Sequence, residues 1–287
     1  YYYVDDDSII FASEIKAILA NPTVPRRISY RGMSNFLSFG HSVAPKTIYE
    51  NIFKLPSGHF MQVRKGRYQI HQYWDVGSML YPGISNTSRG NLRGAILDLL
   101  DDSVRRRMVA DVPVGAFLSG GVDSSAVVAL MSRHFTGKVK TFSLGFNVGG
   151  GYDERSDAAK VARYLNTDHY ELLADEKDCI QALKTLVYHY DEPFGDSASF
   201  PVYLLSRFAR RQVKVVLTGD GGDELFCGYR RYLADDAIHR AQRFLKWFPC
   251  KLLNRAISQL PRMRRLKRVA SSMSIADPAR RYPHWLI

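Results

Sequence analysis

The sequence is poor in cysteine and has no long apolar run. Its three cysteines, Cys179, Cys227 and Cys250, have spacings that match no disulfide framework, zinc site or redox motif. No stretch approaches the roughly 20 apolar residues that a membrane-spanning helix needs, and the first residues show no signal-peptide pattern. We therefore expect a soluble, cytoplasmic protein without a membrane partner.

Acidic residues are scarce toward the end of the chain. The net charge is +12, and beyond Tyr229 there are 14 Lys and Arg residues against three Asp residues, a net charge of +11. Such a segment can bind nucleic acid, but solvated helix faces of an incomplete subdomain are the simpler interpretation. The chain starts at Tyr1 without Met and ends at Trp285-Leu286-Ile287 without a cap or turn. These ends also predict an incomplete chain.

The most informative stretch is a strand-turn-helix pattern in the middle of the chain. Val112–Leu118 is a short apolar run typical of a buried strand, and Ala126–Met131 has the composition of a buried helix. Between them lies Ser-Gly-Gly-Val-Asp-Ser, residues 119–124, whose paired glycines indicate a tight turn. Asp123 and Ser124 are favoured helix N-caps. A glycine-rich turn that leads into a helix N-terminus is typical of an anion-binding site.

This motif differs from the common nucleotide-binding loops. It lacks the Gly-Lys-Ser/Thr of a Walker loop and the third glycine of a dinucleotide fingerprint. It resembles the pyrophosphate loop of the ATP-pyrophosphatase superfamily, whose members cut ATP between the α and β phosphates and form adenylates. The alternative interpretation is an ordinary glycine turn before a core helix.

A second motif, Thr-Gly-Asp-Gly-Gly-Asp-Glu at residues 218–224, follows the apolar run Val213–Leu217. In open α/β sheets, ligands bind at the carboxyl ends of the strands. Mg²⁺ binds there through one or two carboxylates and phosphate oxygens. Because Asp123 and Asp223 follow two different strands, we predict that both bind one Mg²⁺ ion. An acidic surface turn is the alternative.

The predicted elements fall into two groups separated by a linker at Tyr81–Ser88. Before the linker the chain is β-rich, with a helix at Tyr30–Phe39 and a hairpin around Lys65-Gly66; a strand at Ile9–Ala12 leads to a helix at Glu14–Ala20 capped by Ser13. After it, helices and strands alternate, which predicts an α/β fold with a doubly wound parallel sheet. The helices are Leu92–Met108, Asp153–Leu165, Cys179–Tyr190 and Pro201–Arg211, and the further strands are Val139–Phe146, Asp168–Leu173 and Val213–Leu217.

Several motifs together resemble the glutamine-hydrolysing asparagine synthetases. Phe-Ala-Ser-Glu-Ile-Lys-Ala at residues 11–17 and Ile-Phe-Lys-Leu-Pro-Ser-Gly-His at 52–59 are similar to the C-terminal part of that family's glutaminase domain. The glycine loop, the strand Thr-Phe-Ser-Leu-Gly-Phe, Asp191–Ser197 and Thr218–Tyr229 resemble its synthetase domain. The family commonly has Ser-Gly-Glu-Gly or Ser-Gly-Asp-Gly where this chain has Thr-Gly-Asp-Gly.

The resemblance implies a domain organisation. Residues 1–76 would be the C-terminal part of a class II glutamine amidotransferase domain with the N-terminal-nucleophile (αββα) fold. Residues 77–90 would be a linker, and residues 91–287 a C-terminally incomplete ATP-pyrophosphatase-like synthetase domain. The family's nucleophilic cysteine would precede Tyr1, and its catalytic lysine would follow Ile287. Glutamine hydrolysis is therefore not assigned to the residues present.

The resemblance also implies site residues. Leu118, Leu144 and Gly219 would shape the adenine and ribose pocket. The pyrophosphate would be bound by Ser119, Gly120, Gly121, Asp123 and Ser124. Asp220 would contact the nucleotide near the reacting centre and act as the catalytic carboxylate, and Asp123 and Asp223 would bind Mg²⁺.

The activity implied is ATP-dependent amidation of aspartate to asparagine through β-aspartyl-AMP, with release of AMP and pyrophosphate. The substrates would be ATP, aspartate and glutamine or ammonia; a homodimer stays open. A β-lactam synthetase or another adenylate-forming amide ligase is one alternative, and an inactive truncated nucleotide-binding fragment is another. A tRNA-modifying enzyme would suit the basic segment, but the glutaminase-like residues argue against a nucleic-acid substrate.

Overall fold

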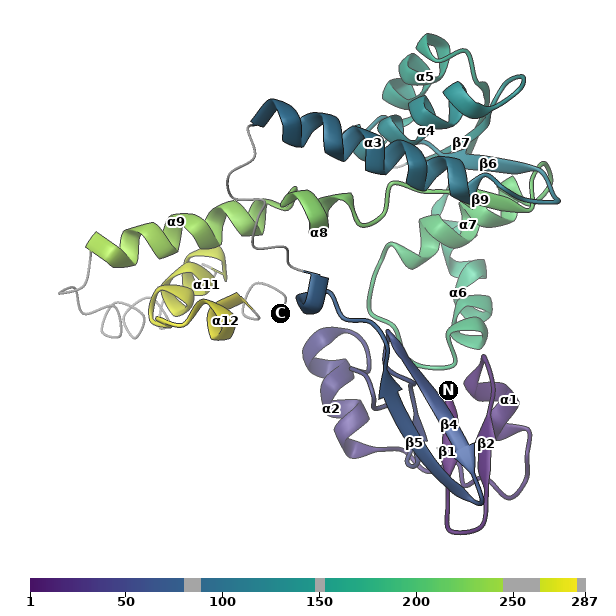
Figure 1. The fold of residues 1–287 in the computed structure, drawn as a ribbon, viewed down its shortest axis with the longest axis vertical. Helices are drawn as coiled ribbons and strands as arrows, with labels where there is room; N and C mark the ends of the chain where they lie inside the picture. Colours follow the sequence, from purple (N-terminus) through teal and green to yellow (C-terminus); the bar gives the residue numbers. More distant parts are fainter. Residues whose placement is uncertain (80–88, 148–152, 245–263, 283–287) are drawn as a thin grey trace. The chain divides into compact units, whose positions relative to one another are not determined.

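The computed structural model describes residues 1–79, 89–147, 153–244 and 264–282 (Figure 1). The chain forms two compact units, Tyr1–Gly219 and Asp220–Ile287, and each is described by itself. The predicted linker Tyr81–Ser88 lies outside the described residues. Within the described ranges, no helix has both the length and the apolar composition needed to cross a membrane.

The N-terminal segment begins with a small antiparallel sheet in the order β2-β1-β3. Its strands are β1 (Tyr2–Val4), β2 (Ile9–Phe11) and β3 (Ile52–Phe53). Helix α1 (Ile15–Leu19) packs against this sheet through Ile15 and Ile18, which are fully buried. The predicted cap at Ser13 is wrong, because the helix begins one residue later and its N-cap is Glu14, whose side chain makes no capping hydrogen bond.

Two further predictions for this segment are confirmed. Helix α2 (Tyr30–Phe39) begins where the Ser29 hydroxyl accepts the Gly32 N–H and ends at Gly40, whose φ is 76°. Strands β4 (His59–Arg64) and β5 (Arg67–Gln72) form an antiparallel hairpin. Lys65 and Gly66, with φ of 50° and 74°, form its turn, because two left-handed residues match the twist of the flanking strands.

The larger sheet has four parallel strands, and their parallel pairing was predicted. Their order in the sheet is β8-β7-β6-β9. The strands are β6 (Val114–Phe117), β7 (Lys140–Phe146), β8 (Asp168–Ala174) and β9 (Val215–Leu217). Gly115 of β6 is opposite Lys140 on one side and Val216 on the other. Successive strands thus extend outward from β6 to β8, and the chain then returns to place β9 on the other side of β6.

Helices cover both faces of this sheet (Figure 1). Val114, Ala116 and Leu118 pack with residues of α3 (Arg89–Arg107), α4 (Val122–His134) and α5 (Arg155–Tyr164). On the opposite face, Phe142 and Leu144 of β7 pack with α6 (Glu176–Tyr190) and α7 (Ser199–Ala209). The doubly wound arrangement is therefore confirmed for this part of the chain. The prediction that the last strand is buried is only partly right, since Val215 is 37% exposed.

His169 of β8 lies in a hydroxyl-rich part of this sheet. Its Nδ1 lies 2.8 Å from Thr141 Oγ1, and its Nε2 lies 3.2 Å from Ser143 Oγ. Burial lowers the pKa of His169 below its ordinary value of 6.5, and Glu171 opposes that shift more weakly. The folded state therefore favours the neutral ring.

We expect this histidine to destabilise the fold in acid. Because its pKa is lower in the folded than in the unfolded state, its stabilising contribution is complete above pH 6.5 and is lost as the pH falls through the folded pKa. An NMR titration should give His169 a pKa below 6.5, and His169→Gln should flatten the acid side of the curve of unfolding free energy against pH. A measured pKa at or above 6.5 would contradict this expectation.

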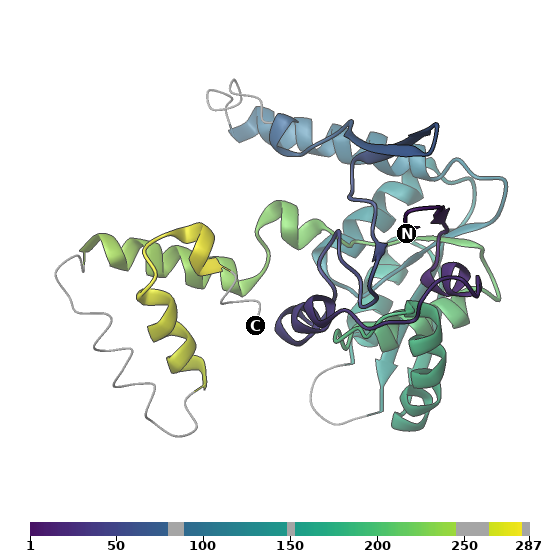
Figure 2. The same ribbon diagram turned by 90° about the horizontal axis from the view of Figure 1, so that it is seen from below.

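The C-terminal unit is helical in its described residues. It contains α8 (Gly222–Phe226), α9 (Arg230–Phe244), α11 (Arg264–Met273) and α12 (Pro278–Arg281), and α11 packs against α9 (Figure 2). Arg281, whose side chain is only 1% exposed, joins α12 to α9. Its Nε and Nη2 donate to the two carboxylate oxygens of Asp235 at 2.6 and 3.0 Å, and its Nη1 donates to Gln242 Oε1 at 2.7 Å. This buried, paired charge ties α12 to α9.

Candidate functional site: a glycine loop at a strand switch point

The glycine loop follows β6 directly. Leu118 is 2% exposed and donates its N–H to the carbonyl of Phe142 at 2.9 Å, which extends the pairing of β6 with β7 by one residue. The chain then turns at Gly120, whose φ of 80° suits glycine. A Cβ on Gly120 would lie 2.8 Å from Ala158 N and from Asp157 C, in the first turn of α5. Both the backbone conformation and the contact with α5 therefore require glycine here.

Two serine side chains hold this loop in shape. Ser119 Oγ and Ser124 Oγ share a hydrogen bond of 2.9 Å, and the Ser119 N–H donates to Ser124 Oγ at 3.2 Å. Ser119 Oγ also accepts the Gly121 N–H at 3.2 Å. The prediction that Asp123 and Ser124 cap the helix is wrong: Gly121 is the N-cap and makes no side-chain hydrogen bond. Asp123 and Ser124 both lie in the first turn of α4, and the Ser124 hydroxyl bonds back to Ser119 instead of capping the helix.

The start of α4 can bind an anion. The first N–H groups of a helix have no intrahelical acceptor, and here the first backbone bond of α4 is donated by Ser125 to Gly121 O at 3.1 Å. The N–H groups of Val122, Asp123 and Ser124 precede it. Together with the positive end of a 13-residue helix dipole, they suit a polyphosphate.

Ser125 is a residue that the sequence reasoning missed. In the described part of the chain, its hydroxyl is buried and has no hydrogen-bond partner. A buried hydroxyl without a partner is unusual and calls for an explanation such as a ligand or water. The signal available in the sequence was its place in Asp-Ser-Ser, directly after two predicted site residues.

The second motif meets the first where the strand order reverses. β6 and β9 are parallel neighbours, with Ala116 opposite Leu217, so Thr218 and Gly219 emerge beside the glycine loop. A Cβ on Gly219 would lie 2.6 Å from Ser124 N and 2.9 Å from Asp123 C. The structure thus brings Gly219 against the first turn of α4. A switch point of this kind is where open α/β sheets bind ligands.

The two leucines predicted to shape the nucleotide pocket are not brought together. The Leu118 side chain is buried in the core formed with α3, α4 and α5. Leu144 is partly buried and packs in the core on the opposite face, with residues of α6 and α7. A contact of either residue with a nucleotide stays a prediction.

The acidic residues of the second motif begin the C-terminal unit. Asp220 follows Gly219 directly and is exposed. Asp223 lies in the short helix α8, and its carboxylate lies against Gly228, which donates its N–H to Asp223 O at 3.0 Å. Among the described residues, no three His, Cys, Asp or Glu side chains cluster as a metal-ligand set. Because Asp123 and Asp223 belong to different units, their joint binding of Mg²⁺ stays a prediction.

Glu224 and Tyr229 fix the shape of the acidic loop. The Tyr229 hydroxyl donates to Glu224 Oε1 at 2.6 Å, and the Arg231 guanidinium lies 4.1 Å from the centre of the Tyr229 ring. The hydrogen bond to Glu224 raises the pKa of Tyr229 to about 12. It also lowers the pKa of the Glu224 carboxyl. Glu224 is therefore engaged within the loop.

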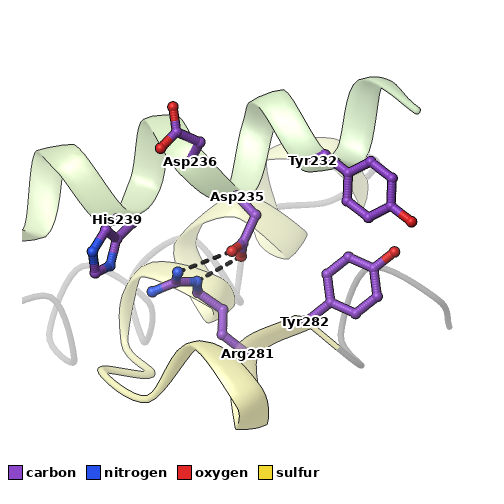
Figure 3. Close-up of a pocket in the computed structure, with 6 residues that line it drawn as sticks. All are labelled: Tyr232, Asp235, Asp236, His239, Arg281 and Tyr282. Carbon is purple, nitrogen blue, oxygen red and sulfur yellow. Dashed lines mark hydrogen bonds and ion pairs between the residues drawn. The ribbon is translucent and has the colours of Figure 1, made fainter. Parts of the chain in front are cut away.

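A separate cavity of about 350 Å³ lies within the C-terminal unit (Figure 3). It is lined by Tyr232, Asp235, Asp236, His239, Arg281 and Tyr282. Arg281 and Asp235 are paired across it, and the rings of Tyr232 and Tyr282 stack with centroids 5.5 Å apart. None of the predicted site residues lines this cavity, so we do not assign it to the nucleotide site.

Comparison with known proteins gives the family. The family model described as asparagine synthase matches residues 95–285, which is well over half of the chain and includes both motifs. The chain belongs to the asparagine synthase family. A second family model, described as glutamine amidotransferase domain, matches residues 1–74. The predicted relation to glutamine-hydrolysing asparagine synthetases is thereby confirmed.

Curated asparagine synthetases are similar along most of the chain. A putative glutamine-hydrolysing asparagine synthetase of Methanocaldococcus jannaschii is 39% identical over 261 residues, covering 88% of this chain and 49% of that protein. Asparagine synthetase 1 of Bacillus subtilis, also glutamine-hydrolysing, is 31% identical over 233 residues, covering 81% of this chain and 36% of that protein. The chain therefore spans half or less of the length of these relatives.

A solved structure is similar more weakly. The NH3-dependent NAD synthetase of Campylobacter jejuni matches 47% of this chain and 60% of its own, with 18% sequence identity and a TM-score of 0.33. A similarity of this size carries no argument about the fold or the function. The family assignment thus depends on the sequence comparisons.

Proposed function

We propose that the chain is part of a carbon–nitrogen ligase that amidates aspartate to asparagine with ATP, through β-aspartyl-AMP. The single observation that carries the proposal is the β6–β9 switch point. There a glycine loop and a helix N-terminus meet Gly219, and the acidic motif follows. Membership of the asparagine synthase family supplies the substrate class. The names of the similar asparagine synthetases support the same substrate.

In the first half-reaction, a β-carboxylate oxygen of aspartate attacks the α phosphorus of ATP. The bond from that phosphorus to the bridging oxygen breaks, and pyrophosphate leaves with the electron pair. The N–H groups of Val122, Asp123 and Ser124, in the first turn of α4, would stabilise the charge that develops on pyrophosphate. Ser119 and Ser124, already hydrogen-bonded to each other, hold the loop in that geometry.

The oxygen ligands in the two motifs fit Mg²⁺. Asp123 in the first turn of α4 would be one ligand and Asp223 the other, with phosphate oxygens completing the set. When bound, Mg²⁺ neutralises negative charge on the leaving pyrophosphate. Carboxylate oxygens are hard ligands of the kind that suit this metal.

In the second half-reaction, ammonia attacks the acyl carbon of β-aspartyl-AMP, and AMP leaves. The attacking nitrogen must lose a proton. We assign the acceptance of this proton to the carboxylate of Asp220. Asp220 is exposed and directly follows Gly219, the residue that packs on the first turn of α4.

The N-terminal segment would belong to the nitrogen-supplying half. Residues 1–76 would be part of an N-terminal-nucleophile glutaminase, residues 77–90 a linker, and residues 91–287 the synthetase part. The match of residues 1–74 to a glutamine amidotransferase domain supports the first assignment. With glutamine as donor, ammonia would pass from that half to the adenylate. A cytoplasmic location and a homodimer are further proposals for the whole protein.

A β-lactam-synthetase-like reaction, or another adenylate-forming amide ligation, shares the first half-reaction and differs in the attacking amine. The similarity to named asparagine synthetases favours aspartate and ammonia over these alternatives. A substrate panel that compares aspartate with N-substituted amino acids would separate them. Ring closure without added ammonium would favour a β-lactam synthetase.

The products formed from ATP test the proposed chemistry. With α-labelled ATP, aspartate, Mg²⁺ and ammonium, we expect labelled AMP and an equal amount of pyrophosphate, because the loop lacks the Walker lysine that acts on the γ phosphate. Omission of aspartate is the control and should abolish AMP formation. Glutamine in place of ammonium tests the nitrogen donor. Labelled ADP as the main product would rule out the adenylation mechanism.

A further inference from the structure

The connection between α6 and α7 carries a motif that the proposed nucleotide site does not use. Asp-Glu-Pro-Phe-Gly-Asp-Ser, residues 191–197, was singled out in the sequence as part of the family resemblance. In the structure, its first two acidic residues contact residues 1–76 and not the glycine loop. All these residues belong to the same compact unit, Tyr1–Gly219.

Glu192 uses both carboxylate oxygens on the N-terminal segment. Its Oε1 accepts the backbone N–H of Ile48 at 2.7 Å, and its Oε2 pairs with Lys54 Nζ at 2.8 Å. The Glu192 side chain is only 8% exposed. Lys54 Nζ also donates to the carbonyl of Ser42 at 2.8 Å. The carboxylate is therefore satisfied by a backbone donor and a fixed cation, both from the N-terminal segment.

Asp191 and Gly195 make the contact broader. Asp191 has a φ of 61°, its side chain is 8% exposed, and its Oδ1 lies 3.1 Å from Lys16 Nζ. The Gly195 N–H donates to the carbonyl of Gly40 at 2.7 Å. A Cβ on Gly195 would lie 3.2 Å from Gly40 Cα. Backbone meets backbone here, which leaves little freedom in how the two segments are placed.

The energetics favour an orienting role for this contact. A buried carboxylate is costly unless it is paired and hydrogen-bonded. The partners of these two carboxylates come from several places: α1, the chain before β3, and the chain after it. Because hydrogen bonds and ion pairs are directional, they hold only one arrangement of the partners. An apolar contact of similar size would tolerate sliding.

We propose that Asp191 and Glu192 are positioning residues that fix the glutaminase-like segment against the nucleotide-binding sheet, so that nitrogen is delivered to the adenylate. The inference rests on the proposed function. α7 follows the motif directly and packs on β7, the strand next to β6. The orientation of the N-terminal segment is therefore tied to the sheet that carries the glycine loop.

Amide hydrogen exchange in this chain tests the docking. The Ile48 N–H donates to Glu192, whereas the Ser29 N–H donates to Ile48 O at 2.8 Å and serves as the matched control. A hydrogen bond to a charged group corresponds to roughly 10- to 100-fold in the opening equilibrium. In Glu192→Ala we expect exchange at Ile48 to accelerate by that factor and exchange at Ser29 to stay within about 3-fold. Equal acceleration at both amides would mean that Glu192 only supports the local fold, and would overturn the proposal.

Nitrogen transfer gives the functional readout, in a protein that carries this chain together with a glutaminase nucleophile. Glu192→Gln and Lys54→Met each remove the ion pair and leave an acceptor for the Ile48 N–H. We expect glutamine-dependent asparagine formation to fall about 10- to 100-fold, since small misplacements can cost that much. Ammonium-dependent formation should stay within about 2-fold, and glutamate formed per asparagine should rise.

Two outcomes of the nitrogen-transfer experiment would overturn the inference. One is an equal fall of glutamine-dependent and ammonium-dependent asparagine formation, and the other is no change in either. Failure of the proposed function itself would look different, because the unaltered protein would then form no AMP and pyrophosphate with ammonium. In that case the exchange experiment still decides whether Glu192 docks the segment. If Glu192→Ala does not fold, the nitrogen-transfer comparison with Glu192→Gln decides the inference.

Discussion

Asp123→Asn and Asp223→Asn are each expected to lower Mg²⁺-dependent pyrophosphate release on the order of 10²-fold, with the fold unchanged. The neutral amide keeps the size of the side chain but is a weak ligand for a hard cation. Loss of a metal ligand or of a donor to the transition state typically has an effect of this size. Asp123 lies in the first turn of α4, where its backbone N–H also faces the anion site, so the substitution alters charge and leaves that N–H in place.

Two exposed carboxylates provide matched controls for this prediction. Asp98 lies on α3 and is exposed, and Asp236 on α9 pairs only on the surface with Arg240. Asp98→Asn and Asp236→Asn should retain rates within about 2-fold, because surface ion pairs contribute little. Rates should be measured as labelled pyrophosphate against Mg²⁺ concentration. Near-normal rates in both Asp123→Asn and Asp223→Asn would exclude the shared-metal hypothesis.

The elements that the sequence predicts well are those with local causes. The strand before the glycine loop and the hairpin at Lys65-Gly66 follow from short apolar runs and, in the hairpin turn, from Gly66, which suits positive φ. The helix starts are less accurate: at Ser13, and at Asp123 and Ser124, a favoured capping residue is present but the cap lies elsewhere. Capping preference is a weak signal when neighbouring hydrogen bonds, such as Ser119 to Ser124, already determine the turn.

The parts of the site that could not be predicted depend on contacts between distant residues. The bond from Ile48 to Glu192 joins residues 144 positions apart, and nothing in either neighbourhood indicates the other. The packing of Gly219 on the first turn of α4 follows from the pairing of β9 with β6, a consequence of strand order. The sequence placed Asp220 and Asp223 in one motif with Gly219, but the boundary between the compact units falls at Gly219 and Asp220.

Gly120→Ala is expected to destabilise the N-terminal unit by about 2–5 kcal/mol. A left-handed conformation costs a residue with a Cβ roughly 1–2 kcal/mol, and Gly120 has a φ of 80°. The new methyl group would also lie 2.8 Å from backbone atoms of Asp157 and Ala158, and overpacking typically adds about 1–3 kcal/mol. Either α5 or the glycine loop would have to move to make room for the methyl group. Because the loop is the proposed phosphate-binding site, ATP binding should weaken as well.

Gly121→Ala is the matched control for the same loop. Gly121 has a φ of −68°, an ordinary value for alanine, and its Cβ would meet only the rotatable Ser119 hydroxyl at 3.2 Å. Replacing an N-cap glycine by alanine should cost below about 1 kcal/mol. The free energy of unfolding of both variants should be measured by urea denaturation, and their ATP affinity by calorimetry. The comparison separates Gly120, which the loop geometry requires, from its neighbour Gly121. Equal losses of stability in the two variants would show that the contact of Gly120 with α5 does not determine the shape of the loop.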